Sequence, residues 1–429
     1  MHPLQKMICD RHHHPGLGIW SCCSANKWVL RAAMRRSKDR YLLIESTANQ
    51  VNQFGGYTDM TPEQFVSFVQ GIAREECFPL SSIILGGDHL GPLVWSDLPE
   101  EEAMLRAETL VRDYVLAGFT KIHLDTSMML AGDRSPLADD VIARRGAQLC
   151  AVCELAYVRR RETYPNTEAP VYVIGSEVPI PGGVQKQEDS ISITRPGAAR
   201  ATIKSFHSHF FHRGLTDAWN RVIALVVQPG VEFGDDTVFD YDHAAAKQLS
   251  AVMDNMGMVF EAHSTDYQTV SGLSEMVRDG FAILKVGPAL TFALREALFA
   301  LAHIEEVLAP VYSFTSSCLR DVLDQEMYRD DSHWKRHYHG TDAEKALKRA
   351  YSYSDRSRYY LPVAAVSEAV LSLMENLSGC DIPLPLIRQY LPSQYYRIIN
   401  KVLDNDPYVL LYDHIGDCID EYLLATGVI

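Results

Sequence analysis

The segment Ile84-Leu85-Gly86-Gly87-Asp88-His89-Leu90-Gly91-Pro92 joins a short apolar run to a polar loop that contains an acid and a histidine. An apolar run of about four to eight residues, flanked by Gly or Pro, is typical of a β-strand that is buried on both faces. The same combination of a buried strand and a polar or glycine-rich end recurs along most of the chain. This recurrence indicates an α/β fold.

Eight strands are predicted in chain order, at Leu17–Ser21, Tyr41–Glu45, Ser82–Gly86, Lys121–Asp125, Val171–Ile174, Val222–Gln228, Met258–Ala262 and Ala282–Val286. Apolar residues recur at helical spacing in the segments between them, such as Pro62–Glu75, Glu101–Ala117 and Ala138–Tyr157. Thr61 and Pro62 have the residue types of a helix cap and a first helical position. Eight such units in roughly 290 residues match a (β/α)8 TIM barrel. A doubly wound open sheet alternates in the same way, but the polar strand ends favour the barrel.

The pattern changes after about residue 305, where the chain becomes helical and aromatic and no further strand series is visible. No long linker rich in Gly, Ser or Pro precedes this part. We therefore expect a barrel over residues 1–305 and, over 306–429, a helical C-terminal extension that packs on the barrel.

The ionisable residues at the strand ends are expected to converge, because the chemistry of barrel enzymes lies where the strands end. They are Glu45, Asp88, His89, Asp125, Glu177, Glu232, Glu261, His263, Asp266 and Lys285. So many carboxylates cannot share a dry cavity uncompensated, since buried like charges repel one another. A divalent cation is the simplest compensation, and we predict Zn²⁺ held by His89, Glu177 and His263. Asp125 is a further candidate ligand. The alternative is that several acids cap helices or pair with Lys285 and nearby arginines.

Catalytic roles are predicted for four of these residues, namely Asp88, Asp125, Glu177 and Lys285. The predicted substrate contacts are Glu45, Asn49, Gln53, Gln228, Ser264, Asp266, Arg295, Arg356 and Arg358. Barrels often hold phosphate with the loops after strands seven and eight. Arg356 and Arg358 lie among aromatic residues, a composition that suits an anion held over the barrel mouth. An aromatic helix with arginine stems packed on its rings is the alternative.

Composition argues against several classes of function. The net charge is −15, from 55 acidic and 40 basic residues, so nucleic acid and anionic lipid are not expected partners. No run of about 18 apolar residues is present, and Met1–Gly16 has no apolar run typical of a signal peptide. The nine cysteines are scattered and odd in number, which suits free thiols in a reducing cytoplasm. We expect Cys150 and Cys153, a lone CxxC in a helical stretch, to be buried thiols.

The chain resembles the Z-type, non-catalytic subunits of class II D-tagatose-1,6-bisphosphate aldolase. The matching segments are Glu45 to Pro62, Ile84 to Pro92, Ala117 to Asp125, Val173 to Gly183, Val226 to Phe233, Glu261 to Thr269, Phe281 to Ala297, Tyr353 to Tyr360 and Ile382 to Pro392. Ser46 and Ser176 depart from the family's pattern, which has Ala and Thr, but neither change removes a charge. The resemblance implies a barrel, a role in galactitol, N-acetylgalactosamine or tagatose catabolism, and association with the catalytic aldolase subunit.

Two functions follow as expectations. In the first, the chain is an oligomeric subunit that supports a separate aldolase acting on a ketohexose phosphate such as tagatose 6-phosphate or 1,6-bisphosphate. In the second, it is itself a metal-dependent 4-epimerase of tagatose 6-phosphate, or of tagatose and fructose, acting by retro-aldol and aldol steps. Glu177 or Asp125 would then be the general base. The family has also carried the label tagatose-6-phosphate kinase. No GxxxxGK[ST] motif is present, so a kinase is not expected.

Overall fold

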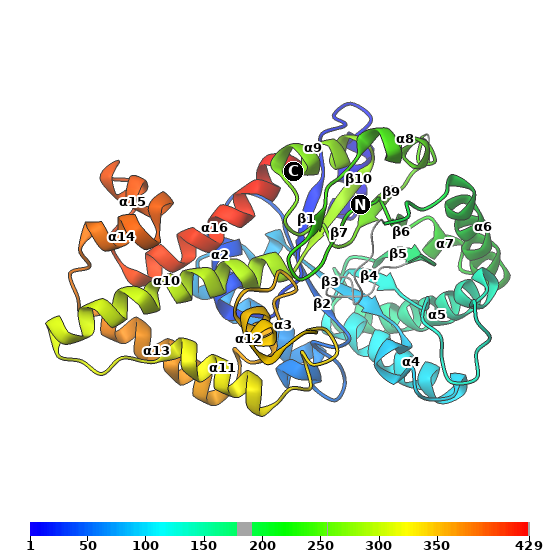
Figure 1. Ribbon diagram of the computed structural model, residues 1–429. Coiled ribbons are helices and arrows are strands. Elements are labelled where there is room, and N and C mark those ends of the chain that lie inside the picture. Colours follow the sequence, from blue (N-terminus) through cyan, green and yellow to red (C-terminus); the bar gives the residue numbers. More distant parts are fainter. Residues whose placement is uncertain (178–190, 255, 428–429) are drawn as a thin grey trace.

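The computed structural model describes residues 1–177, 191–254 and 256–427. Eight parallel strands close into a barrel, in which chain order and spatial order agree and the last strand pairs with the first (Figure 1). The strands are β1 (Ile19–Cys22), β2 (Leu42–Thr47), β3 (Ile83–Leu90), β4 (Lys121–Leu124), β5 (Val171–Gly175), β6 (Val222–Val227), β9 (Val259–Ala262) and β10 (Phe281–Val286). All eight predicted strands and the (β/α)8 fold class are confirmed.

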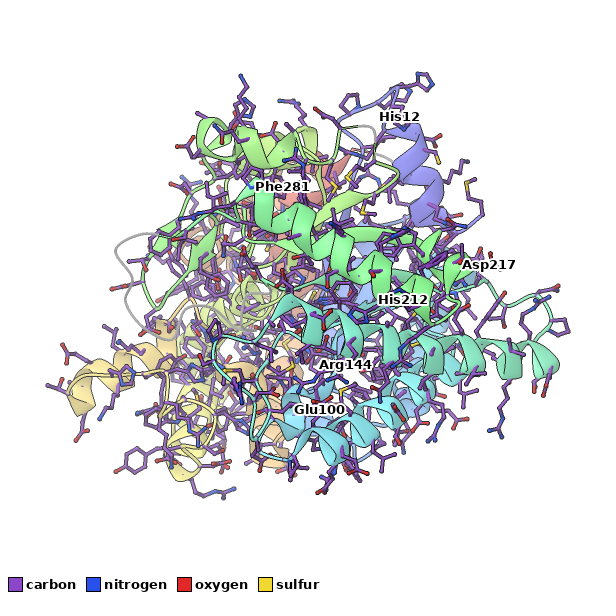
Figure 2. The ribbon with its side chains drawn as sticks, turned by 90° about the vertical axis from the view of Figure 1, so that its right-hand side faces the viewer. His12, Glu100, Arg144, His212, Asp217 and Phe281 are labelled. Atoms are coloured by element: carbon purple, nitrogen blue, oxygen red, sulfur yellow. The ribbon has the colours of Figure 1, made fainter. Side chains whose placement is uncertain are left out.

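Helices follow the strands and cover the outside of the barrel. They are α2 (Lys27–Arg36), α3 (Pro62–Glu75), α4 (Glu100–Ala117), α5 (Asp139–Thr163), α6 (Pro196–His212), α7 (Thr216–Trp219), α8 (His243–Ser250), α9 (Val270–Arg278) and α10 (Pro288–Tyr312). α3 begins as predicted, because Thr61 and Gln64 form a capping box in which each side chain accepts the other's backbone N–H. Figure 2 shows Glu100 beside Arg144, an ion pair of 2.5 Å that ties α4 to α5.

The amino end of the barrel is filled with apolar side chains. Helix α1 (Pro3–Asp10), which was not among the predicted helices, brings Leu4 and Met7 into one cluster with residues from the strand starts, such as Leu43 and Ile84. Polar side chains inside the barrel therefore gather toward the opposite end, where the strands finish.

The C-terminal third is helical, as predicted, and lies to the left of the barrel in Figure 1. It contains α11 (Leu319–Arg329), α12 (Asp342–Tyr351), α13 (Ala364–Ser378), α14 (Leu384–Tyr390), α15 (Pro392–Ile399) and α16 (Pro407–Thr426). α16 packs against α2, α9 and α10. α10 continues through residue 305, so the predicted boundary falls inside a helix and the division of the chain at that point stays a prediction.

The extension is also joined to the barrel mouth through a small hairpin, β7 (Glu232–Phe233) and β8 (Val238–Phe239). Asp235 in its turn lies 2.8 Å from the Lys348 ammonium and accepts a hydrogen bond of 2.9 Å from the Ser352 hydroxyl. Strands of two residues are too short for a periodic pattern, so they could not be predicted from the sequence.

Cys150 and Cys153 are buried free thiols on α5, as predicted. Within the described ranges, no helix is both long and apolar enough to span a membrane.

Candidate active site

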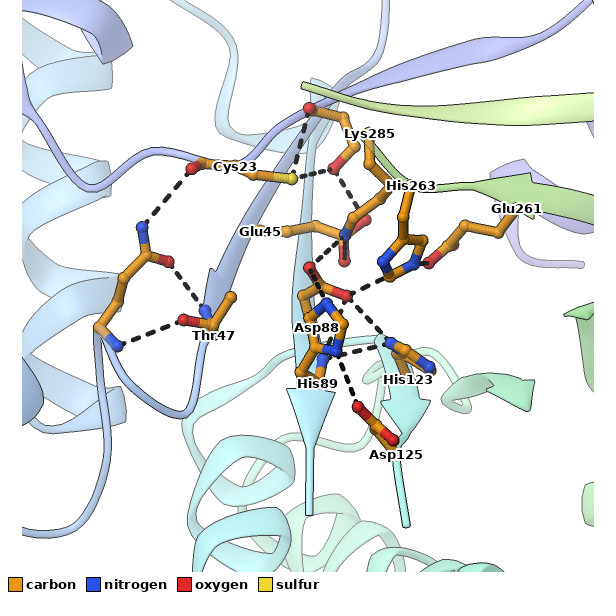
Figure 3. Close-up of polar contacts among 12 residues, drawn as sticks. Cys23, Glu45, Thr47, Asp88, His89, His123, Asp125, Glu261, His263 and Lys285 are labelled. Atoms are coloured by element: carbon orange, nitrogen blue, oxygen red, sulfur yellow. Dashed lines mark hydrogen bonds and ion pairs between the residues drawn. The ribbon is translucent and has the colours of Figure 1, made fainter. Parts of the chain in front are cut away.

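Four charged side chains from four strands meet in the barrel interior, and Figure 3 shows three of them, Glu45, Glu261 and Lys285. The Lys121 ammonium of β4 lies 2.8 and 2.9 Å from the two carboxylate oxygens of Glu45 and 2.7 Å from Oε2 of Glu261. The Lys285 ammonium of β10 lies 2.7 Å from Oε2 of Glu45. All four side chains are buried. Each acid therefore has a cation as its neighbour, which buried charges require.

Asp88, near the end of β3, connects this interior network to the barrel mouth. Its carboxylate lies 3.0 Å from the Lys285 ammonium and 3.0 Å from Nδ1 of His123. Burial alone would raise the pKa of Asp88, but His89, Lys285 and His263 hold it well below its usual value. Asp88 is therefore an anion in the folded protein.

Three imidazoles surround this carboxylate. The ring centres of His89, His123 and His263 lie 4.8 to 5.3 Å from one another. Burial lowers the pKa of His263 to about 4 in spite of the acids near it, so this ring is neutral at pH 7. A neutral imidazole has a lone pair available for a metal ion.

His89 has a carboxylate partner of its own. Its Nδ1 lies 2.7 Å from Oδ2 of Asp125, and Asp125 accepts hydrogen bonds from the backbone and the hydroxyl of Ser127. Burial opposes the charge on His89, but Asp88 and Asp125 outweigh it and raise the pKa of the imidazole. The pKa of Asp125 is lowered in turn, because the His89 hydrogen bond and charge outweigh its burial.

The backbone is strained at two of these strand ends. His89 and Ser264 have φ angles of 47° and 52°, in the left-handed region that a residue with a side chain rarely occupies. Gly91 lies so close to the end of β4 that a Cβ atom there would be 1.6 Å from the carbonyl oxygen of Asp125. Strain and close approach of this kind cluster at functional sites.

The donor set fits a divalent cation. Asp88, His123, Glu261 and His263 each offer a ligand atom, and these atoms all lie within 4.8 Å of one another. Nε2 of His123 is buried without a hydrogen-bond partner among the described residues. Carboxylate and imidazole are usual ligands of catalytic zinc and related ions.

The balance of charge in the cluster also favours a bound cation. Two buried ammonium groups, those of Lys121 and Lys285, face four buried carboxylates in this network, those of Glu45, Asp88, Asp125 and Glu261. The carboxylates outnumber the ammonium groups, and a bound cation would reduce the excess of negative charge. The cluster can therefore bind a metal ion, and the identity of that ion stays a prediction.

A cavity of about 130 Å³ opens above the cluster. Eight of the residues predicted for catalysis, metal or substrate line it. Seven belong to the barrel, namely Asn49, Asp88, His89, His263, Ser264, Asp266 and Lys285, and the eighth is Arg358 from the extension. Asp266 accepts hydrogen bonds from the backbone of Gly287 and Ala289 at the start of α10, at 3.0 and 2.8 Å. Burial raises its pKa to about 6.

Other predicted residues lie elsewhere. Glu177 is exposed and accepts a hydrogen bond from Thr194, whose backbone N–H in turn donates to the carbonyl of Gln228. The structure therefore does not bring Glu177 together with His89 and His263, and its predicted roles stay predictions. Residues 178–183, which belong to the same predicted loop, lie outside the described residues.

Three predicted substrate residues have structural partners instead. Gln53 donates to the backbone carbonyl of Arg106 on α4. Arg295 is buried, 3.5 Å from Asp355, with its guanidinium 4.2 Å from the ring centre of Phe292. Arg356 is buried and lies 3.0 Å from Nδ1 of His337. Arginine packed on aromatic rings was the alternative stated for the segment of Arg356 and Arg358, and both guanidinium groups lie over the Tyr359 ring, 5.9 and 4.9 Å from its centre.

His123 and Lys121 were not predicted as site residues, although both belong to the cluster. Their signal is the alternation of side chains along a strand, in which every second residue faces the same side. Lys121, His123 and Asp125 follow one another at this spacing, as do Glu261 and His263. A barrel strand whose inward positions are all ionisable indicates a site, even where one residue alone does not.

The chain matches a known protein family over almost its whole length. The sequence pattern described as "D-tagatose-1,6-bisphosphate aldolase subunit GatZ/KbaZ-like" matches residues 4–427. The crystal structure of a probable tagatose 6 phosphate kinase from Sinorhizobium meliloti 1021 has 44% sequence identity and a TM-score of 0.86, covering 95% of this chain and 100% of its own.

Two other solved structures are only distantly similar. The fructuronate-tagaturonate epimerase UxaE from Cohnella laeviribosi has 13% identity and a TM-score of 0.48, over 96% of this chain and 84% of its own. The YdjI aldolase from Escherichia coli K12 has 12% identity and a TM-score of 0.41, over 85% of this chain and 98% of its own. Similarities of this size say nothing about what the present chain does.

Proposed function

The chain belongs to the D-tagatose-1,6-bisphosphate aldolase subunit GatZ/KbaZ-like family, and from this membership we propose that it works in ketohexose-phosphate metabolism as the Z-type subunit that supports a catalytic aldolase. The pathway would be the catabolism of galactitol, N-acetylgalactosamine or tagatose. The family match and the close similarity over almost the whole chain support this proposal.

A surface suited to a partner subunit is present on the extension. Tyr396, Ile399 and Val402 are exposed apolar residues on and just after α15, and Leu384 is exposed on α14. These helices stand out from the body of the molecule in Figure 1. Exposed aromatic and aliphatic side chains are what the centre of a protein–protein interface requires.

The observation that carries the proposal further is the buried cluster of Asp88, His123, Glu261 and His263. A subunit that only supported another chain would gain no stability from keeping so many ionisable groups in its interior. We therefore propose that the pocket has chemistry of its own and takes a ketohexose phosphate.

A divalent cation, which we propose to be Zn²⁺, would be held by Asp88, His123, Glu261 and His263 and would supply a Lewis acid that polarises the substrate carbonyl. The protein groups have separate tasks. Lys285, fixed between Glu45 and Asp88, keeps a positive charge beside the reacting atoms. His89 lines the pocket and can exchange a proton with a substrate hydroxyl. Asp125 does not line the pocket and would act by holding His89 in its orientation.

The second candidate is an autonomous 4-epimerase of tagatose 6-phosphate, and the presence of acid, base and metal ligands in one chain favours it. The hydroxyl on C4 would lose its proton to His89, and the bond between C3 and C4 would break with its electron pair passing to the C2–C3 unit. C4 would then be an aldehyde. After this aldehyde rotates, re-addition of C3 to its other face and return of the proton would complete the inversion at C4.

Turnover by the purified chain tests both functions. The chain would be incubated with a divalent metal and either tagatose 6-phosphate or tagatose 1,6-bisphosphate, and the products would be followed by NMR. Fructose 6-phosphate that disappears on chelation would establish the epimerase. Triose phosphates that form only after a catalytic aldolase subunit is added would establish the supporting subunit.

Two variants make this experiment specific. His263→Ala should abolish epimerase turnover and leave the fold intact. His243→Ala is the matched control, because His243 is an exposed histidine that pairs with Asp279 on the surface. No product from the wild-type chain under either condition, with no metal bound, would contradict the proposed function.

A further inference from the structure

The C-terminal extension contributes one wall of the pocket. The short 3₁₀ turn η4 (Ser357–Tyr359) places Arg358 and Tyr359 in the cavity lining, opposite Tyr57 from the loop after β2. The rings of Tyr57 and Tyr359 meet edge to face with centres 4.6 Å apart. Residues about 300 positions apart in the chain therefore form one surface, and the barrel alone does not complete the pocket.

Arg358 is held in a fixed orientation. Its guanidinium lies 4.9 Å from the ring centre of Tyr359, and it donates hydrogen bonds to the Asp355 carbonyl at 3.1 Å and the Tyr359 hydroxyl at 3.4 Å. Among the described residues no carboxylate accepts a hydrogen bond from Arg358, so its positive charge is available to an anion in the pocket. An ordered guanidinium is suited to a phosphate ester, which it can bind through two parallel N–H groups.

Two other cationic or N–H-rich parts of the cavity lining are already engaged. The Lys285 ammonium contacts the carboxylates of Glu45 and Asp88. The start of α10, where barrels often hold phosphate, donates the N–H groups of Gly287 and Ala289 to the carboxylate of Asp266. A phosphate there would have to displace or approach an acid, which is unfavourable.

We propose that Arg358, with the phenol groups of Tyr57 and Tyr359, binds the phosphate of the ketohexose phosphate, so that the helical extension completes the substrate site. This assignment rests on the proposed function, because it uses the same pocket. The sugar carbon chain would run from this phosphate toward Asp88, His89 and His263. The extension would then determine that the pocket prefers phosphorylated over free sugars.

Calorimetric titration of the full-length chain tests the assignment, with D-tagatose 6-phosphate and D-tagatose as the two probes. Arg358→Gln should weaken binding of the phosphate ester by about 10- to 100-fold, the effect of losing a hydrogen-bonded charge, and leave binding of free tagatose unchanged. Arg358→Lys should bind the ester with an affinity between those of wild type and Arg358→Gln, since lysine keeps the charge but lacks the two parallel N–H groups. Arg388→Gln is the matched control, because Arg388 stacks on Tyr395 and Tyr396 in the same extension and does not line the pocket.

The outcomes separate the assignment from the function. An Arg358→Gln protein that loses affinity equally for both probes would overturn the phosphate site. Wild-type protein that binds tagatose as tightly as tagatose 6-phosphate would overturn it too. Turnover of tagatose 6-phosphate that survives Arg358→Gln with an unchanged KM would do the same while leaving the proposed function in place. Arg358-dependent binding of the ester without turnover in any combination would support the phosphate site and count against the function.

Discussion

Lys121 and Glu261 form an ion pair in the barrel interior, with 2.7 Å between Nζ and Oε2 and neither side chain exposed to solvent. Lys121 also contacts Glu45. Glu45 and Glu261 in turn contact two residues nearer the mouth, Lys285 and His263. Glu45 contacts Lys285, and Glu261 lies 3.0 Å from Nε2 of His263. One lysine beneath the site therefore keeps both branches of the network in position.

Replacing Lys121 with Met should destabilise the fold strongly. The substitution leaves Glu45 and Glu261 less compensated in a buried environment, and breaking a buried pair costs about 3 to 5 kcal/mol. Denaturant unfolding would measure the change. Lys335→Met, in an exposed pair with Asp331, is the control and should change the free energy of unfolding by about 0.5 kcal/mol or less. Equal stability of the two variants would contradict the role assigned to Lys121.

Gly91→Ala should disrupt the contact between the ends of β3 and β4. The added Cβ would lie 1.6 Å from the Asp125 carbonyl oxygen, so the backbone has to move. We expect a large drop in melting temperature together with loss of the His89–Asp125 geometry. Gly71→Ala, in α3 with no atom within 4 Å of the new methyl group, should instead stabilise the helix by about 1 kcal/mol. A Gly91→Ala protein that melts like the wild type would show that this close approach is not required.

Asp266 should make stability depend on pH. Its pKa is raised to about 6 in the folded protein, above an ordinary value of 3.8, so the fold favours the protonated form. This stabilising contribution is fully present below about pH 4 and is lost as the pH rises through about 6. In Asp266→Asn the amide oxygen can still accept from Gly287 and Ala289, but the titration is gone.

The comparison is between melting curves of wild type and Asp266→Asn at pH 4 and pH 7. Between pH 4 and pH 7 the free energy of unfolding of the variant should rise relative to that of the wild type by up to about 3 kcal/mol. A stability difference that does not change with pH would mean that the buried carboxyl titrates normally.

The fold could be predicted because its signals are local. Most of the buried strands are apolar runs, and α3 begins where Thr61 and Pro62 supply a cap and a first residue. Helix α1 is short, and its role depends on residues far away in the chain, the apolar side chains around Leu43 and Ile84 at the amino end of the barrel. Nothing in Pro3–Asp10 alone indicates that it packs there.

The site was predicted in part for a related reason. Asp88, His89, His263 and Lys285 lie in or just after the last residues of their strands, and the closed barrel brings these strand ends together. His123 lies within a strand, and only the inward alternation through Lys121 and Asp125 shows its direction. Glu177 lies just after a strand end as well, yet its side chain is exposed. Position along the chain does not determine which way a loop residue points.

The central claim is that Asp88, His123, Glu261 and His263 hold a divalent cation, and metal analysis tests it most directly. Wild type, His123→Ala and His89→Ala would be saturated with Zn²⁺, desalted, and analysed by mass spectrometry for metal per chain. The account predicts about one ion per wild-type chain and almost none in His123→Ala, with His89→Ala retaining metal. A wild-type chain that retains no divalent ion, or a His123→Ala protein that binds as much as wild type, would contradict it.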